Sequence, residues 1–371
     1  MMTNDKMIYV HIPFCDSKCF YCDFISGKYN ESVKNQYVNA LQTEIINNRN
    51  DIQPISSIFI GGGTPSSIKK EYIKQIIECV KQNFKVLPDV EITIETNPCS
   101  VTLEKLIYYV NCGINRISFG VQSLDNNLLN VIGRRHNKDQ ALEAVSLAKR
   151  AGFLNINCDV LIGIPGQTYE QLLNTVETLI KTGITHISCY MLINEPNTVL
   201  TNKIEAGEVN QVDDDLCVQW YNDINLFLKQ NGFLRYEVSN FCKQGFECKH
   251  NCGYWNIKQY YGFGVAAHSY IDNIRKANTT NLNKYIAGDY CANQEKLTSN
   301  EIIEEKLLLG LRLVEGVSVS ELKELGYDIL SAKKQEIELL KKQGVVEVDN
   351  NIKITTNYFG VGDDITLKLL P

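Results

Sequence analysis

Hydrophobic and polar positions change their spacing several times along the first half of the chain. Short runs rich in β-branched residues are separated by longer stretches whose apolar residues recur at helical spacing, a pattern typical of a parallel βα series. Strands are predicted at residues 8–12, 55–60, 90–95, 116–120, 155–162 and 186–190. Helices are predicted at residues 31–48, 67–82, 102–111, 138–151 and 169–181. Six such units predict an α/β fold, an incomplete TIM-like (β/α)6 barrel.

The second half of the chain has a different pattern. A helix is predicted at residues 213–230, and a stretch rich in cysteine and tyrosine follows at residues 236–270. Residues 299–371 predict helices at 301–313, 319–325 and 332–342 and two short strands near 344–356. We therefore expect a barrel domain at residues 1–280, a linker at 281–298, and a small helical, winged-helix-like domain at 299–371.

Charge and hydropathy limit the classes of partner. The net charge is −6 and no run of five Lys or Arg residues occurs, so we expect nucleic acid not to be a main partner. No apolar stretch reaches 18 residues, and the first residues are polar, which favours a cytoplasmic location. In that reducing compartment, clustered thiols among the 13 cysteines bind metal more often than they pair.

Three cysteines follow directly after the first predicted strand. Cys15, Cys19 and Cys22 have the spacing C-x3-C-x2-C. Three thiolates from one tight loop can bind three corners of a 4Fe-4S cluster and leave the fourth iron open. The alternative is a zinc site with His11 as the fourth ligand. The cluster is favoured because the motif ends the first strand of a βα series.

The sequence around these cysteines resembles the radical SAM superfamily. The segment from Tyr9 to Phe24 is similar to the branch that contains oxygen-independent coproporphyrinogen III oxidase and the haem chaperone HemW. This resemblance implies that the amino and carboxylate groups of S-adenosylmethionine (SAM) chelate the open iron. Electron transfer from the reduced cluster can then break a bond of the sulfonium group.

Later strand ends carry groups that suit SAM. Gly61–Gly63 follow the second predicted strand, and Thr64 and Pro65 suit the N-cap and first position of the next helix. The glycine motif resembles the one that meets the SAM ammonium, and no GK[ST] ending is present that would make a P-loop. Singly, each such residue is also compatible with a structural role. Together, the resemblance implies these SAM contacts: Tyr9, Tyr21, Gly62, Gly63, Thr64, Glu95, Gln122, Arg134, Asp159 and Ile193.

A second motif separates two branches of the family. His250, Asn251, Tyr254 and Trp255 match the H-N-x-x-Y-W string of HemW proteins, whereas Phe24 stands where the coproporphyrinogen oxidases have a fourth cysteine. A neutral imidazole can ligate haem iron, and Tyr and Trp rings can stack on a porphyrin, so these four residues are haem candidates. The alternative is a structural histidine beside core aromatics.

Three further cysteines bracket the histidine of this motif. Cys242, Cys248 and Cys252 are compatible with a second metal site, although incidental free thiols are favoured because the resemblance requires none of them.

The function favoured by the sequence is that of a haem chaperone. It would hold a 4Fe-4S cluster and SAM, carry haem as cargo, and deliver it to acceptor haemoproteins such as those of the respiratory chain. The alternative is an enzyme, an oxygen-independent coproporphyrinogen III oxidase, and no residue is assigned as catalytic. A radical SAM enzyme that modifies tRNA would need a basic RNA-binding surface, which the net negative charge of the chain disfavours. A homodimer and a peripheral contact with a membrane are compatible with the chain.

Overall fold

A sheet with seven parallel strands forms the centre of the computed structural model, which describes residues 5–371. All six predicted strands are present, and β9 pairs in parallel with β1 as a seventh. Strands β2 and β3 begin earlier than predicted. Residues 85–89 of β3 are exposed or partly exposed, so the hydrophobic pattern did not reveal them. Across the sheet, the strands are β9 (Tyr260–Phe263), β1 (Lys6–Ile12), β2 (Asn50–Gly62), β3 (Phe84–Thr96), β4 (Arg116–Gln122), β5 (Asn155–Ile162) and β6 (His186–Met191).

Antiparallel strands extend this sheet at both edges, and the sheet stays open. The fold class is confirmed, because the parallel strands curve into a partial barrel that does not close. The strands beyond β9 are β10 (His268–Ile271), β11 (Ile274–Asn278) and β12 (Cys291–Lys296), and those beyond β6 are β8 (Asn240–Cys242) and β7 (Leu234–Arg235).

The segment expected as a linker has regular structure. Residues 281–298 include α10 (Leu282–Ile286) and the edge strand β12, which pairs with β11. Every side chain of β12 is exposed, so the strand has no hydrophobic face and depends on backbone pairing. The other domain boundaries stay predictions.

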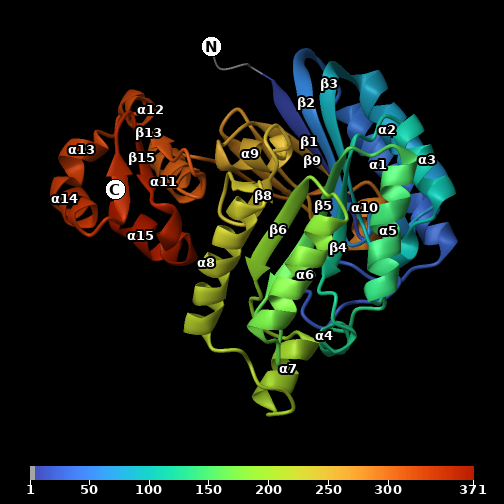
Figure 1. Ribbon diagram of the computed structural model, residues 1–371. Helices are drawn as coiled ribbons and strands as arrows, with labels where there is room; N and C mark the ends of the chain where they lie inside the picture. The colour runs from blue at the N-terminus through green and yellow to red at the C-terminus, as the bar shows by residue number, and fades with distance from the viewer. Residues whose placement is uncertain (1–4) are drawn as a thin grey trace.

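Helices cover the outer face of the parallel strands (Figure 1). The predicted helices are present, and two of those that cover the sheet begin with capping boxes, Asn137 with Gln140 and Thr168 with Gln171. One large apolar core lies between the strands and these helices. The helices are α1 (Glu31–Asn47), α2 (Lys70–Asn83), α3 (Leu103–Asn111), α5 (Lys138–Ala151), α6 (Tyr169–Lys181) and α8 (Asp214–Gln230).

Two short helices lie at the edge of the sheet where the parallel strands end. Helix α4 (Asn126–Val131) follows β4, and α7 (Val199–Glu205) follows β6, so both appear at the bottom of Figure 1. Helix α9 (Lys249–Trp255) carries the H-N-x-x-Y-W string and contacts β2 and the C-terminal unit.

The C-terminal residues form a separate small unit with its own apolar core. Its three-stranded sheet and helices agree with the predicted winged-helix-like arrangement. The backbone N–H of Val238 donates to the carbonyl of Arg312 (2.8 Å), which joins the unit to the main sheet. The elements are α11 (Ser299–Gly310), β13 (Val317–Ser318), α12 (Val319–Glu324), α13 (Ile329–Ala332), α14 (Lys334–Lys342), β14 (Val346–Val348), β15 (Asn351–Ile354) and α15 (Gly362–Leu369).

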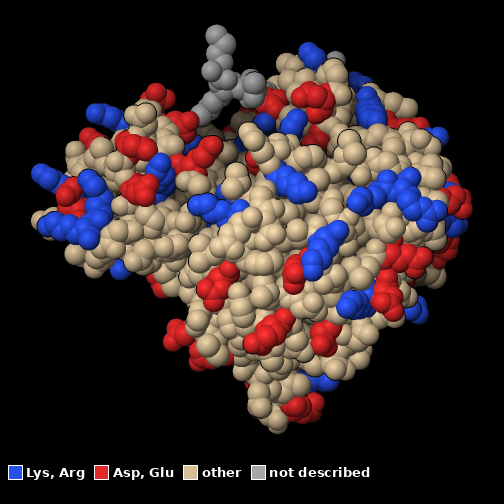
Figure 2. Space-filling model, in the orientation of Figure 1, with Lys and Arg blue, Asp and Glu red and all other residues tan. Residues whose placement is uncertain are grey.

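Acidic and basic side chains are interspersed on the face of the molecule shown in Figure 2. Neither sign of charge gathers into an extended field on that face. Among residues 5–371, no helix combines the length and apolar character needed to cross a membrane.

Candidate functional site

The cysteine loop follows β1 and is fixed at several points. The N–H of Cys15 donates to the carbonyl of Gly27, which closes the loop on itself (3.0 Å). The N–H of Phe20 donates to the carbonyl of Ile132 (3.0 Å), and the Phe20 ring lies so close to Gly133 that a Cβ there would be 2.7 Å from it. The loop is therefore docked on the turn after α4, where glycine is required.

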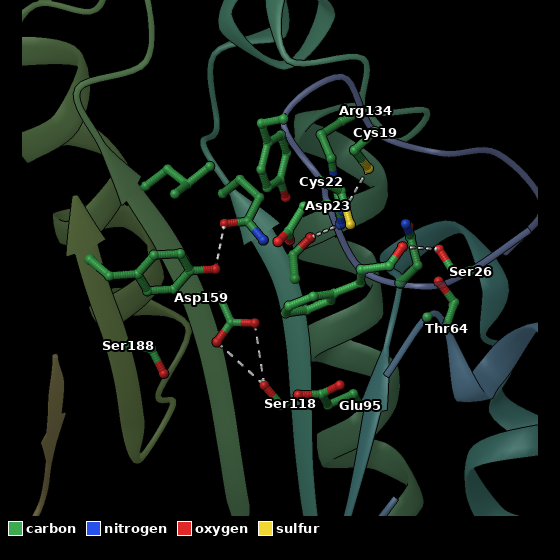
Figure 3. A pocket seen from close by; sticks show the side chains of 18 of the residues that line it. Cys19, Cys22, Asp23, Ser26, Thr64, Glu95, Ser118, Arg134, Asp159 and Ser188 are labelled. Atoms are coloured by element: carbon green, nitrogen blue, oxygen red, sulfur yellow. Dashed lines mark hydrogen bonds between the residues drawn. The ribbon is translucent and has the colours of Figure 1, made fainter. Parts of the chain in front are cut away.

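The three thiols and the predicted SAM residues meet at one cavity of about 520 Å³. It lies at the carboxyl ends of the parallel strands, where ligands gather in βα folds. Figure 3 shows side chains from several strands and from the cysteine loop around it. Its lining includes Cys15, Cys19, Cys22, Tyr21, Gly62, Gly63, Thr64, Glu95, Gln122, Arg134, Asp159 and Ile193.

Two predicted details differ from the structure. Tyr9 does not line the cavity, because it lies three residues before the end of β1, where its hydroxyl contacts Nδ1 of His11 (3.0 Å). Thr64 precedes a short 3-10 turn rather than α2 itself, and its side chain caps no backbone N–H. Its Oγ1 lies instead 3.4 Å from Sγ of Cys15.

The surroundings of the thiols fit a cluster better than a zinc ion. Nη1 of Arg134 donates to Sγ of Cys19 (3.3 Å), the type of outer contact that tunes a metal centre. His11, the alternative zinc ligand, uses Nδ1 toward Tyr9 and Nε2 toward the carbonyl of Ile25 (3.3 Å). Neither nitrogen is left for a metal.

Within residues 5–371, no group of three His, Cys, Asp or Glu side chains is arranged to hold a single metal ion.

Two carboxylates face the cavity from neighbouring parts of the sheet. Oε2 of Glu95 accepts from the N–H of Gly62 (3.1 Å), and Asp159 accepts from Asn157 (2.8 Å) and from Ser118. Burial and the charge of Asp159 raise the pKa of Glu95 to about 7. Burial also raises the pKa of Asp159. SAM has an ammonium group, a carboxylate and ribose hydroxyls. The acidic side chains around the cavity suit the ammonium and the hydroxyls, and the guanidinium and the glycine N–H groups suit the carboxylate.

Sequence reasoning missed several residues that shape this cavity. Ser118 links Asn157 to Asp159, and the hydroxyl of Tyr190 donates to Oε1 of Gln122 (3.2 Å). Gln122 has a φ of 69°, a left-handed conformation that non-glycine residues rarely adopt. Ser118 and Tyr190 lie in strands that end at the cavity, and this position could have identified them as cavity residues. The family motifs did not include them as ligand contacts.

Comparisons with known proteins agree with this geometry. Residues 9–179 match the model of the radical SAM superfamily, and residues 297–356 match that of the HemN C-terminal domain. The heme chaperone HemW of Bacillus subtilis is 37% identical over 84% of this chain and 85% of its own length. That of Lactococcus lactis is 32% identical over 100% of this chain and 98% of its own.

The chain belongs to the HemW family of the radical SAM superfamily. Membership implies a 4Fe-4S cluster and SAM as cofactors. The Escherichia coli coproporphyrinogen III oxidase HemN has a similar fold, with a TM-score of 0.85 over 99% of this chain and 90% of that one. At 22% identity, that likeness shows the fold alone.

The histidine of the HemW string is buried inside the molecule. Nδ1 of His250 lies 2.9 Å from Oγ of Ser57 on β2, and its ring stacks on Phe59 at 5.1 Å between centroids. It is 1% exposed and does not line the SAM cavity. Its position therefore gives no support to the prediction that it ligates haem.

The other residues of the HemW string are partly buried and line cavities. Asn251 lines the SAM cavity and also a second cavity, of about 460 Å³, which Tyr254 and Trp255 line as well. Cys242 and Cys248 are buried, and Cys248 faces Glu91 on β3. In the part of the chain that the structure describes, these thiols and Cys252 form no metal site.

Proposed function

We propose that this chain is a haem chaperone, which binds haem, a 4Fe-4S cluster and SAM and delivers haem to acceptor haemoproteins. The observation that carries the proposal is the similarity to relatives named heme chaperone HemW, at 32–37% identity over most of the chain. The acceptors would be haemoproteins such as those of the respiratory chain, met in the cytoplasm or at a membrane surface. The proposal is compatible with a homodimer of this chain.

The residues around the first cavity have distinct roles in this proposal. Cys15, Cys19 and Cys22 would hold the cluster, which when bound can supply one electron to SAM. Glu95 would hold the ammonium beside the N–H of Gly62. The other SAM contacts would be Tyr21, Gly63, Thr64, Gln122, Arg134, Asp159 and Ile193.

The alternative function is that of an oxygen-independent coproporphyrinogen III oxidase. The fold is shared with such an oxidase, so the fold does not separate the two functions. Phe24 favours the chaperone, because it stands where the oxidases resembled here have a fourth cysteine. Its side chain is 59% exposed on the wall of the cavity.

The deciding experiment uses full-length protein purified without oxygen and with its cluster reconstituted. Ferric haem is titrated against it and followed by the Soret band, and coproporphyrinogen III turnover is measured separately with SAM and reductant. The chaperone proposal predicts saturable haem binding, about one per chain, without turnover. Turnover without haem binding would select the oxidase instead.

A further inference from the structure

The second cavity has the walls that a flat aromatic ligand requires. It is bounded by α9, by β9 to β11 of the main sheet, and by α11 of the C-terminal unit. Its volume of about 460 Å³ falls in the range of small-molecule sites. Its apolar and aromatic lining consists of Tyr254, Trp255, Ile257, Tyr260, Tyr270 and Leu309.

Charged groups lie on the wall of this cavity. Arg275 on β11 donates from both Nη1 and Nη2 to the carboxylate of Glu305 on α11, at 2.6 and 2.8 Å. Lys258 also lines the cavity, where it pairs with Asp5 and donates to Oγ of Ser56 (2.9 Å). Each of these cations is already paired with a carboxylate of the protein, so the wall holds fixed ion pairs rather than a surplus of positive charge.

Two phenol oxygens in the cavity, those of Tyr254 and Tyr260, make no hydrogen bond with any residue from 5 to 371. The ring of Tyr260 meets that of Tyr254 edge to face at 4.7 Å. Arg275 lies close enough to oppose the rise that burial causes in the pKa of Tyr260. By contrast, the hydroxyl of Tyr270 contacts Oδ1 of Asn273 (3.0 Å). Of Tyr254 and Tyr260, only Tyr260 has a neighbouring cation that favours its phenolate, and a phenolate is a known type of haem ligand.

We infer that the second cavity binds haem, with Tyr260 as the ligand to its iron and the aromatic lining packed against the porphyrin. The bond forms between the phenol oxygen and ferric iron, and the phenol proton passes to solvent. His250 stays behind Tyr254, whose ring it meets at 4.7 Å, and does not reach the iron. This inference rests on the proposed chaperone function and gives the cargo a place separate from SAM.

The arrangement also gives the C-terminal unit a part in binding. Leu309 and Glu305 come from α11, so this cavity exists only while that unit is docked on the main sheet. Asn251 lines both cavities, so the haem would lie next to the SAM site without sharing it.

The test is a ferric haem titration of full-length, cluster-loaded protein with and without saturating SAM. Leu309→Trp fills the cavity and should weaken haem binding by at least about tenfold, while SAM still changes the electron paramagnetic resonance (EPR) spectrum of the cluster. Leu339→Trp is the matched control, because Leu339 on α14 is 57% exposed and lines neither cavity. Wild-type affinity is expected for it.

A second pair of variants tests the iron ligand. Tyr260→Phe should abolish the phenolate–iron bands in the resonance Raman spectrum, whereas Tyr270→Phe should retain them. Unchanged haem affinity in Leu309→Trp, unchanged phenolate bands in Tyr260→Phe, or displacement of haem by SAM would overturn the inference and leave the chaperone function standing. Failure of the wild type to bind haem would refute the proposed function and the inference with it.

Discussion

At the scale of single residues, the side chains around the thiols decide how the cluster behaves. Arg134 connects Sγ of Cys19 with the carbonyl of Gly120, so one guanidinium links the cysteine loop to β4. A cation that donates to a cluster thiolate stabilises the reduced, more negative state. Arg134 is therefore expected to raise the reduction potential of the cluster.

Arg134→Gln should lower that potential. The loss of one charge-assisted hydrogen bond, on the order of 1.4 kcal/mol, corresponds to about 60 mV for one electron. An EPR-monitored redox titration measures the shift. Arg135→Gln is the control, because Arg135 is the next residue and is exposed. Equal midpoint potentials for the two variants would contradict this role of Arg134.

The raised pKa of Glu95 predicts a pH dependence of SAM binding. The carboxylate attracts the SAM ammonium only when it is deprotonated, so affinity should fall as pH falls through about 7. Glu95→Gln should bind SAM about tenfold more weakly at pH 8 and lose this dependence. Calorimetric titrations between pH 6 and pH 8.5 measure both effects. The same pH profile in the variant would show that another group is responsible.

At the scale of elements, the sequence predicted the parts whose burial is continuous. The runs at β1, β4 and β5 are buried almost throughout, so their hydrophobic pattern located them closely. Edge strand β12 has no buried side chain, and β9 has only four residues, so neither produced a pattern. Strands of these two kinds are determined by backbone pairing with their neighbours in the folded sheet, which the sequence pattern does not show.

The candidate site was predictable to the extent that its residues end strands. The cysteine spacing and the glycine run located the first cavity. The depth of Tyr9 and His250 within the sheet layer could not be predicted, because it depends on tertiary packing, and their roles as ligands stay predictions. The second cavity was not predictable at all, since α9, β11 and α11 meet there only in the folded chain.

Gly63 tests how closely the glycine run supports the cysteine loop. A Cβ at this position would lie 2.8 Å from the carbonyl oxygen of Phe14 and 3.0 Å from that of Ile12. Gly63→Ala should therefore displace the loop, weaken SAM binding about tenfold and cost about 1–3 kcal/mol of unfolding free energy. Calorimetry and urea denaturation measure these changes.

The control for this variant is Gly362→Ala. Gly362 begins α15 with a helical φ of −62°, and a Cβ there makes only an ordinary contact with Ile354. Alanine should be neutral or slightly stabilising at this position. Equal SAM affinity in both variants would mean that the loop tolerates the added methyl group.

At the scale of the whole molecule, the two units meet around a buried arginine. Arg235 on β7 lies against the rings of Tyr221 (4.4 Å), Phe241 (4.9 Å) and Phe359 (5.3 Å). Its Nη1 also donates to the carbonyl of Thr356 (2.9 Å). Because Phe359 and Thr356 belong to the C-terminal unit, this side chain joins that unit to the main sheet.

Arg235→Ala should loosen the joint between the units. Loss of three ring contacts and of the buried hydrogen bond is expected to lower the unfolding free energy by about 2–4 kcal/mol. Urea denaturation measures it, with Arg150→Ala as a control at an exposed position of α5, where a change within about 0.5 kcal/mol is expected. A similar small change in Arg235→Ala would show that the joint does not depend on this residue.

The central claim is that three thiols hold an iron–sulfur cluster whose open corner SAM can reach. The most direct measurement is the EPR spectrum of anaerobically purified, reduced protein, recorded before and after SAM is added. We predict a 4Fe-4S signal whose g values shift with SAM and which is absent from Cys19→Ser. Bound zinc in place of iron, or a cluster signal that SAM leaves unchanged, would contradict the account.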